Sequence, residues 1–193
     1  MKILLFCCKG FETMEFAPFV DVFGWARNDF HYDIDVVTCG FTKVVTSTFG
    51  VPVTVDKTFD EICADDYAAL AIPGGFENYG FYEDAFDKRF LDLIAEFDRQ
   101  GKYIASICVG ALPIGKSGVL TGRCATTYHL SGGARQRQLA AFGVHVIPDQ
   151  RIVQDRSIIT SFCPETAADV AFRLLTGLVG EEKAGAVIAA MGY

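Results

Sequence analysis

The chain has 193 residues, of which 51% are hydrophobic and 21% are charged, and this composition is that of an ordinary soluble globular protein. The length suits one domain with a sizeable core, which we expect to span residues 1–193. A formal net charge of −7 argues against a nucleic-acid partner, because phosphate binding usually requires a basic patch. The run Arg135–Arg137 is locally basic, but it lies in a helical pattern and is expected to form a solvated face.

No segment has the pattern of a membrane span or a secretion signal. The first apolar run ends after six residues at Lys9, which is too short for the core of a signal peptide. Seven cysteines, an odd number, argue against a disulfide framework, and no C-x-x-C pair or metal-ligand spacing of histidines occurs. We therefore expect a cytoplasmic protein with no metal, no cofactor and no membrane partner.

Short β-type runs alternate with helical patterns along the chain, which is typical of βαβ units around a mostly parallel sheet with helices on both faces. The predicted strands are Ile3–Cys8, Ile34–Thr38, Ala68–Ile72, Tyr103–Ile107 and Ile158–Ser161. The predicted helices lie near Met14–Arg27, Phe86–Arg99, Val109–Ser117, Leu130–Phe142 and Thr166–Leu178. Two side excursions are expected, one at Lys43–Val55 and one made of Gly143–Ile147 and Arg151–Gln154.

Cys108 lies where a buried strand runs directly into a helix. Ser106 and Gly110 on either side are small, as a sharp strand-to-helix turn requires. The free N–H groups and the positive dipole end of the helix would favour the thiolate form of the cysteine. The pattern is that of a nucleophile elbow with Cys in place of Ser, although a buried cysteine at an ordinary strand end has the same local sequence.

Two other strand ends could contribute to the same site, because ligands of open α/β sheets bind beyond the carboxyl ends of the strands. Pro73-Gly74-Gly75 follows a predicted strand, and its glycines either point backbone N–H groups at an oxyanion or simply make a tight turn. Glu12 and Glu15 follow the first strand at a helix start. There a carboxylate either complements the helix dipole or acts as acid or base beside the thiol.

The loop Phe76–Tyr82 carries four aromatic residues in seven, which predicts either a pocket wall or a subunit contact. His129 is the histidine nearest to a plausible site. A lone histidine is more often structural than catalytic, and the local pattern does not decide between these roles.

Taken in order, these stretches resemble the DJ-1/PfpI (ThiJ/PfpI) superfamily nearly end to end. Gly10–Glu15 resembles the family's G-x-E-x-x-E segment, Pro73–Gly75 its P-G-G loop, and Ala105–Gly110 its A-x-x-C-x-G elbow. Ile158–Ser161 is similar to the family's closing strand. The resemblance implies a flavodoxin-like, class I glutamine amidotransferase-like fold, in which helices sandwich a doubly wound, mostly parallel sheet. It also implies a homodimer.

The resemblance assigns roles to particular residues. Cys108 would be the nucleophile, and Glu15 would hydrogen-bond its sulfur while protonated or act as a general acid/base. Backbone N–H groups of Gly75 and Val109, with Gly74 beside them, would bind the oxyanion or substrate. The family also has a histidine directly after a Thr-Thr pair.

In this chain Tyr128 occupies the histidine's place, and His129 comes one residue later. His129 is a candidate third catalytic residue. A one-residue slip swings a side chain to the other side of a strand, so Tyr128 could face Cys108 instead.

Two functions follow from this machinery. The first is a cysteine-dependent hydrolase, hydratase or lyase that acts on a small carbonyl-, amide- or nitrile-like molecule, with glyoxalase-, amidase- and isonitrile-hydratase-like reactions as examples. The alternative is a redox-sensing or protective, chaperone-like protein that uses the same oxidisable cysteine. The stretch Leu120–Thr127 also resembles the isonitrile hydratase branch. That branch carries Asp in place of Glu15 and Thr in place of Val109, which weakens the specific assignment.

Overall fold

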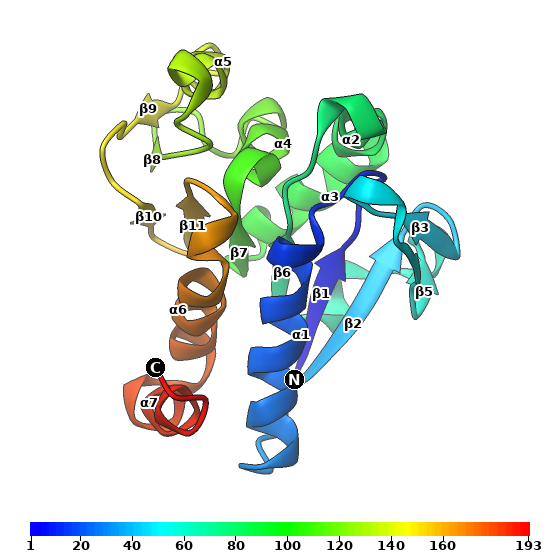
Figure 1. The fold of residues 1–193 in the computed structure, drawn as a ribbon, viewed down its shortest axis with the longest axis vertical. Coiled ribbons are helices and arrows are strands. Elements are labelled where there is room, and N and C mark those ends of the chain that lie inside the picture. The colour runs from blue at the N-terminus through cyan, green and yellow to red at the C-terminus, as the bar shows by residue number, and fades with distance from the viewer.

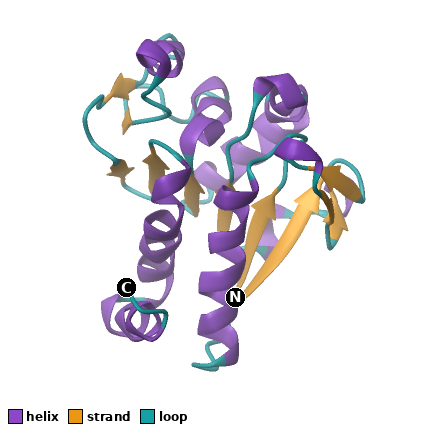
Figure 2. Ribbon diagram, viewed as in Figure 1, coloured by secondary structure: helices purple, strands orange, loops and turns teal.

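A seven-stranded sheet forms the centre of the structure, a computed structural model that describes residues 1–193 (Figures 1 and 2). Neighbouring strands are parallel, except that the edge strand β10 runs antiparallel to β11. The central strands β6 and β7 are largely apolar and buried because helices cover both of their faces. In spatial order the strands are β10 (Ile152–Asp155), β11 (Ile158–Ser161), β7 (Tyr103–Ser106), β6 (Ala69–Ile72), β1 (Lys2–Phe6), β2 (Asp35–Gly40) and β5 (Lys57–Thr58).

Helices cover the sheet in two layers. α1 (Thr13–Asn28) and α6 (Ala167–Val179) pack side by side in front of the sheet in Figure 1, and α7 (Glu181–Ala190) contacts both. Behind the sheet, α3 (Lys88–Arg99) packs against β6 and β7 and beside α4 (Ala111–Lys116). The predicted fold class, a single-domain α/β protein with a doubly wound and mostly parallel sheet, is therefore confirmed.

The sequence of α3 explains its position against the sheet. Asp87 caps the helix by accepting a hydrogen bond from the Arg89 backbone N–H at 2.8 Å. Apolar side chains then recur every three to four residues, and burying each one stabilises the fold by roughly 1.5–3 kcal/mol. The buried members of this stripe are Phe90, Leu93, Ile94 and Phe97.

All five predicted strands are present, and the predicted side ribbon is the hairpin of β3 (Val44–Thr46) and β4 (Pro52–Thr54). The second predicted excursion is wrong in part. Of the predicted Arg151–Gln154 segment, Ile152–Gln154 falls in β10 and joins the main sheet, because its backbone pairs with β11. Only β9 (His145–Val146) stays outside, where it pairs with β8 (Cys124–Ala125).

The helices differ from prediction mainly at their ends. The helix predicted from Leu130 begins only at α5 (Ala134–Ala140), because Gly132 and Gly133 adopt φ values of 66° and 72°. The short helix α2 (Phe81–Ala85) and the terminal α7 were not predicted. None of the helices is both long and apolar enough to cross a membrane.

Candidate functional site

The segments that follow β1, β6 and β7 meet at one cavity of about 330 Å³. This is the carboxyl end of the sheet, where open α/β proteins bind ligands. The three predicted strand ends therefore come together. The residues that line the cavity are Glu12, Glu15, Gly75, Phe76, Glu77, Tyr82, Cys108, Val109, Tyr128, Ser131, Ala134, Arg135 and Pro164.

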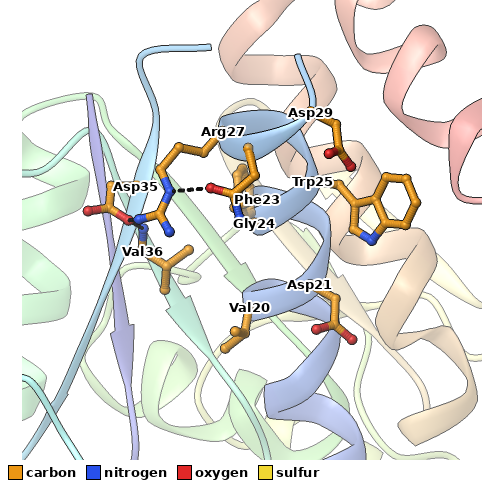
Figure 3. Close-up of a pocket in the computed structure, with 10 residues that line it drawn as sticks. Val20, Asp21, Phe23, Gly24, Trp25, Arg27, Asp29, Asp35 and Val36 are labelled. Atoms are coloured by element: carbon orange, nitrogen blue, oxygen red, sulfur yellow. Dashed lines mark hydrogen bonds and ion pairs between the residues drawn. The ribbon is translucent and has the colours of Figure 1, made fainter. Parts of the chain in front are cut away.

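A second hollow, of about 430 Å³, lies beside the carboxyl-terminal half of α1 (Figure 3). Arg27 reaches across it and donates a hydrogen bond to the Asp35 carboxylate at 2.6 Å. Asp35 begins β2, so this hollow lies at the amino end of a parallel strand, opposite the end at which such folds bind ligands. The cavity that contains Cys108 is therefore the candidate active site.

Cys108 adopts a strained backbone conformation, with a φ of 55° that residues other than glycine rarely adopt. It opens a tight turn that leads directly from β7 into α4. Its carbonyl oxygen accepts a hydrogen bond from the Thr127 hydroxyl at 2.7 Å, which holds the turn in place. Gly110 has to be small, because a Cβ there would lie 2.6 Å from the Ile72 carbonyl oxygen. These features are those of a nucleophile elbow.

Glu15 lies in the first turn of α1 and is only 1% exposed. Its Oε2 accepts a hydrogen bond from the Gly74 N–H at 2.5 Å. Burial raises the pKa of Glu15 to about 8, and Glu12 adds to this rise, while the Gly74 N–H and the Cys108 thiol oppose it. Glu15 therefore holds a proton at neutral pH and can donate a hydrogen bond to the sulfur.

The environment of the Cys108 thiol differs from the one that the helix start alone predicts. Burial, followed by the charge of Glu15, raises the pKa of Cys108 well above its usual range, and the Val109 N–H acts in the opposite direction. The expectation of a thiol pKa lowered by the helix is therefore wrong. Because part of the rise comes from the Glu15 carboxylate, protonation of Glu15 favours the thiolate.

Gly75 and Val109 line the cavity as the oxyanion prediction requires. The Gly75 N–H makes no hydrogen bond within the chain, and a Cβ at this position would overlap the Gly10 carbonyl oxygen. The Gly74 N–H, also predicted as a donor to the oxyanion or substrate, donates a hydrogen bond to the Glu15 Oε2. Gly74 therefore holds the acid in place, and the oxyanion role of Gly75 and Val109 stays a prediction.

His129 lies outside this cavity. Its Nδ1 is 3.4 Å from the Cys163 Sγ, and its ring stacks on Phe162 with the centroids 4.1 Å apart. Tyr128 lines the cavity together with Cys108. The one-residue offset thus turns His129 toward Cys163, and this position does not support the predicted catalytic role of His129.

The polar wall of the cavity was not predicted. Arg135, expected on a solvated face, lines the cavity with 31% of its side chain exposed and donates a hydrogen bond to Glu77 at 2.6 Å. Its guanidinium carbon lies 5.2 Å from the centroid of the Tyr82 ring. The Tyr82 hydroxyl is buried and has no hydrogen-bond partner. The aromatic density of the loop Phe76–Tyr82 is the one sequence feature that points to this wall.

Both Glu12 and Glu15 line the cavity, although helical spacing would allow one of them to point outward. Glu12 is 7% exposed, and burial raises its pKa. The hydrogen bond from Gly74 goes to Glu15 and distinguishes the two carboxyl groups.

Comparisons with known proteins identify the family of this chain. The sequence model of the DJ-1/PfpI family matches residues 1–177. Deglycase PfpI of Pyrococcus furiosus is 32% identical over 167 residues, which cover 85% of this chain and 91% of that protein. Isonitrile hydratase of Pseudomonas putida is 30% identical over 149 residues, which cover 77% of this chain but only 61% of that protein. The crystal structure of Drosophila melanogaster DJ-1beta superposes with a TM-score of 0.85 and 26% identity, covering 98% of this chain and 96% of that one. The chain belongs to the DJ-1/PfpI family.

Proposed function

We propose that this protein is a cysteine-dependent enzyme of the hydrolase, hydratase or lyase type that acts on a small carbonyl-, amide- or nitrile-like molecule. The pairing of Cys108, on a strained elbow, with the buried Glu15 carboxyl carries the proposal. A cavity of about 330 Å³ suits a small substrate. The relatives named deglycase and isonitrile hydratase support chemistry of this kind. The seven free thiols suit a reducing compartment, so we place the activity in the cytoplasm.

In the proposed reaction, the Cys108 thiolate adds to the electrophilic carbon of the substrate, and a π electron pair moves onto the substrate oxygen or nitrogen. The N–H groups of Gly75 and Val109 donate hydrogen bonds to the developing negative charge. Glu15, which holds a proton at neutral pH because burial raises its pKa to about 8, can hydrogen-bond the thiolate and give its proton to the leaving group or adduct.

A turnover screen over glyoxals, amides and isonitriles tests the proposal, with Cys108→Ser as the inactive control. Limited alkylation near neutral pH, followed by peptide mass mapping, should label Cys108 first among the cysteines. Preferential labelling of another cysteine, or turnover that survives Cys108→Ser, contradicts the assignment.

The role of Glu15 has a matched control in Glu12, which lines the same cavity and whose pKa burial also raises. Glu15→Gln should change the pH dependence of Cys108 alkylation, because it removes a proton donor next to the sulfur. Glu12→Gln should leave that dependence nearly unchanged. Equal effects of the two variants exclude a special role for Glu15.

A second candidate function is a response to oxidants. The observation that favours it is the Glu15 carboxyl, which is protonated at neutral pH and could donate a hydrogen bond to a Cys108 sulfinic acid. Peroxide-dependent modification of Cys108 without turnover of any substrate would favour this function over the enzyme.

A further inference from the structure

A second cysteine leaves the sheet beside Cys108. β7 and β11 are parallel neighbours whose register pairs Ala105 with Ile159. Cys108 follows β7 by two residues, and Cys163 follows β11 by two residues. Continued along the chain, this register sets Phe162 opposite Cys108, and Cys163 lies one residue further on. Neighbouring strands lie about 4.8 Å apart, and a disulfide joins Cα atoms separated by roughly 4.4–6.8 Å. The two cysteines therefore leave adjacent strands at the same edge of the sheet, and a disulfide forms when their two sulfur atoms approach each other.

Contacts beyond the sheet keep these two segments together. The Ser161 hydroxyl lies 3.5 Å from the Ser106 carbonyl oxygen, within hydrogen-bond range, so the segments stay adjacent past their last paired residues. Pro164, next to Cys163 in sequence, lines the same cavity as Cys108. Burial and Glu15 raise the pKa of Cys108, and Cys163 adds to this rise, as expected for neighbouring thiols.

The segment that contains Thr127 and His129 touches both cysteines. Thr127 binds the Cys108 carbonyl oxygen at 2.7 Å, and the His129 Nδ1 lies 3.4 Å from the Cys163 Sγ. The imidazole ring is fixed by its stack on Phe162, with an interplanar angle of 27°. A fixed imidazole at this distance can accept the proton of the Cys163 thiol, and the thiolate is the form that attacks another sulfur.

We propose that Cys163 is the resolving cysteine of Cys108, so that a hydroperoxide converts the pair into an intramolecular disulfide. The proposal rests on Cys108 being the reactive thiol of the proposed function, but it requires no carbonyl or nitrile substrate. It assigns His129 to Cys163 as its proton acceptor.

The chemistry proceeds in two balanced steps. The Cys108 thiolate attacks one peroxide oxygen, the O–O bond breaks, and the leaving oxygen takes a proton, giving a sulfenic acid and an alcohol or water. The Cys163 sulfur then attacks the Cys108 sulfur while His129 takes the thiol proton, and the S–O bond breaks as that proton reaches the departing hydroxide. The peroxide gains two electrons, and the two thiols lose them in forming the S–S bond.

The remaining cysteines are less suited to this role. Cys63 is exposed in the turn that precedes β6, and Cys7, Cys8 and Cys39 are buried around β1 and β2. Cys124 is half-buried in β8, which pairs with β9 outside the main sheet. None of these five cysteines follows a strand that neighbours β7, as Cys163 does.

The test treats the full chain with one to a few equivalents of hydrogen peroxide, blocks remaining thiols and maps peptides without reduction. The expected product is a Cys108–Cys163 linked peptide, with little sulfinic acid at Cys108. Cys163→Ser should abolish the link and direct Cys108 to the sulfinic acid, whereas Cys63→Ser should leave the link intact. His129→Gln should slow linking by about 10²-fold, the lower end of the help that a positioned base gives.

Sulfinic acid at Cys108 in the wild-type chain, with no linked peptide, overturns the resolving role and leaves the proposed enzyme function untouched. A link from Cys108 to any other cysteine also overturns it. Because the wild-type result is read on the unaltered protein, a folding defect in Cys163→Ser cannot imitate either outcome. Oxidation confined to cysteines other than Cys108 would overturn the reactive-thiol assignment on which both proposals depend.

Discussion

The Tyr82 hydroxyl is buried without a hydrogen-bond partner, and the Tyr82 side chain lines the cavity that contains Cys108. A buried donor without a partner costs about 1–3 kcal/mol, and a substrate oxygen that accepts its hydrogen bond removes that cost. Tyr82→Phe should therefore keep or raise the free energy of unfolding of the ligand-free protein. It should also lower kcat/KM by roughly 2–10-fold, the value of one neutral hydrogen bond. Urea denaturation and steady-state kinetics measure the two effects.

Tyr79→Phe is the matched control for Tyr82, since Tyr79 lies in the same loop but is 42% exposed. Tyr79→Phe should leave both the free energy of unfolding and kcat/KM unchanged. If Tyr82→Phe lowers stability and kcat/KM together, the hydroxyl has a structural partner and does not bind substrate. Normal alkylation of Cys108 in Tyr82→Phe would show that the thiol itself is unaffected.

At the scale of elements, Gly74 joins the loop after β6 to the first turn of α1. A Cβ at Gly74 would lie 2.8 Å from the Ile107 carbonyl oxygen and 2.9 Å from the Glu15 Oε2. Gly74→Ala should therefore move the loop away from Glu15, lower the free energy of unfolding by about 1–3 kcal/mol and reduce turnover. The Gly74 N–H lowers the pKa of Glu15, so loss of this hydrogen bond should keep Glu15 protonated to a higher pH. Because protonation of Glu15 favours the thiolate, the pH profile of Cys108 alkylation should shift downward.

Gly24→Ala provides the matched control for this change. Gly24 lies inside α1 with no atom within 4 Å of an added Cβ, so alanine there should stabilise the protein by roughly 0.5–1 kcal/mol. Its alkylation profile should match that of the wild type. Equal pH profiles for Gly74→Ala and Gly24→Ala would contradict the positioning role of Gly74.

The elements that sequence predicts well are those whose patterns follow directly from burial. The sheet core and the elbow at Cys108 were predictable because a buried parallel strand is an apolar run and a sharp turn needs small neighbours. The side of the strand on which Tyr128 and His129 lie could not be predicted, because a shift of one residue reverses the direction of both side chains. The thiol pKa of Cys108 was predicted in the wrong direction because the helix start is visible in sequence, whereas the extent of burial is not.

At the scale of the whole molecule, an aromatic cluster at the rim of the active-site cavity is exposed to an unusual degree. Phe49 is 69% exposed, Phe76 46% and Tyr79 42%, and the Phe49 ring lies within 5.8 Å of both other rings. Contact with a second copy would remove this apolar area from water. We predict a homodimer, and sedimentation at micromolar concentration should give about twice the 21.1 kDa chain mass.

Phe49→Ser should shift this equilibrium toward the monomer. Leu130→Ser is the control, because Leu130 is also exposed, at 51%, but lies outside the rim cluster. A monomer throughout the micromolar range contradicts the dimer prediction. If both variants shift the monomer–dimer equilibrium equally, the rim cluster does not form the dimer contact.

The buried acid at position 15 should also make the stability of the whole protein depend on pH. Burial raises the pKa of Glu15 from 4.5 to about 8 in the folded state, so between these values the unfolded chain loses a proton that the folded chain keeps. The contribution is fully present below about pH 4.5 and is lost as pH rises through 8, a total on the order of 5 kcal/mol at 1.36 kcal/mol per pH unit. Glu15→Gln removes this dependence. Its free energy of unfolding relative to wild type should rise by about 1.4 kcal/mol per pH unit from pH 5 to 8, measured by urea denaturation.

Glu61→Gln is the control, because hydrogen bonds from Thr58 lower the pKa of Glu61. The difference in free energy of unfolding between Glu61→Gln and wild type should stay constant over that pH range. A Glu15→Gln difference that does not change between pH 5 and 8 would mean that the carboxyl is ionised in the folded protein, and Glu15 could then not serve as the proton donor to Cys108.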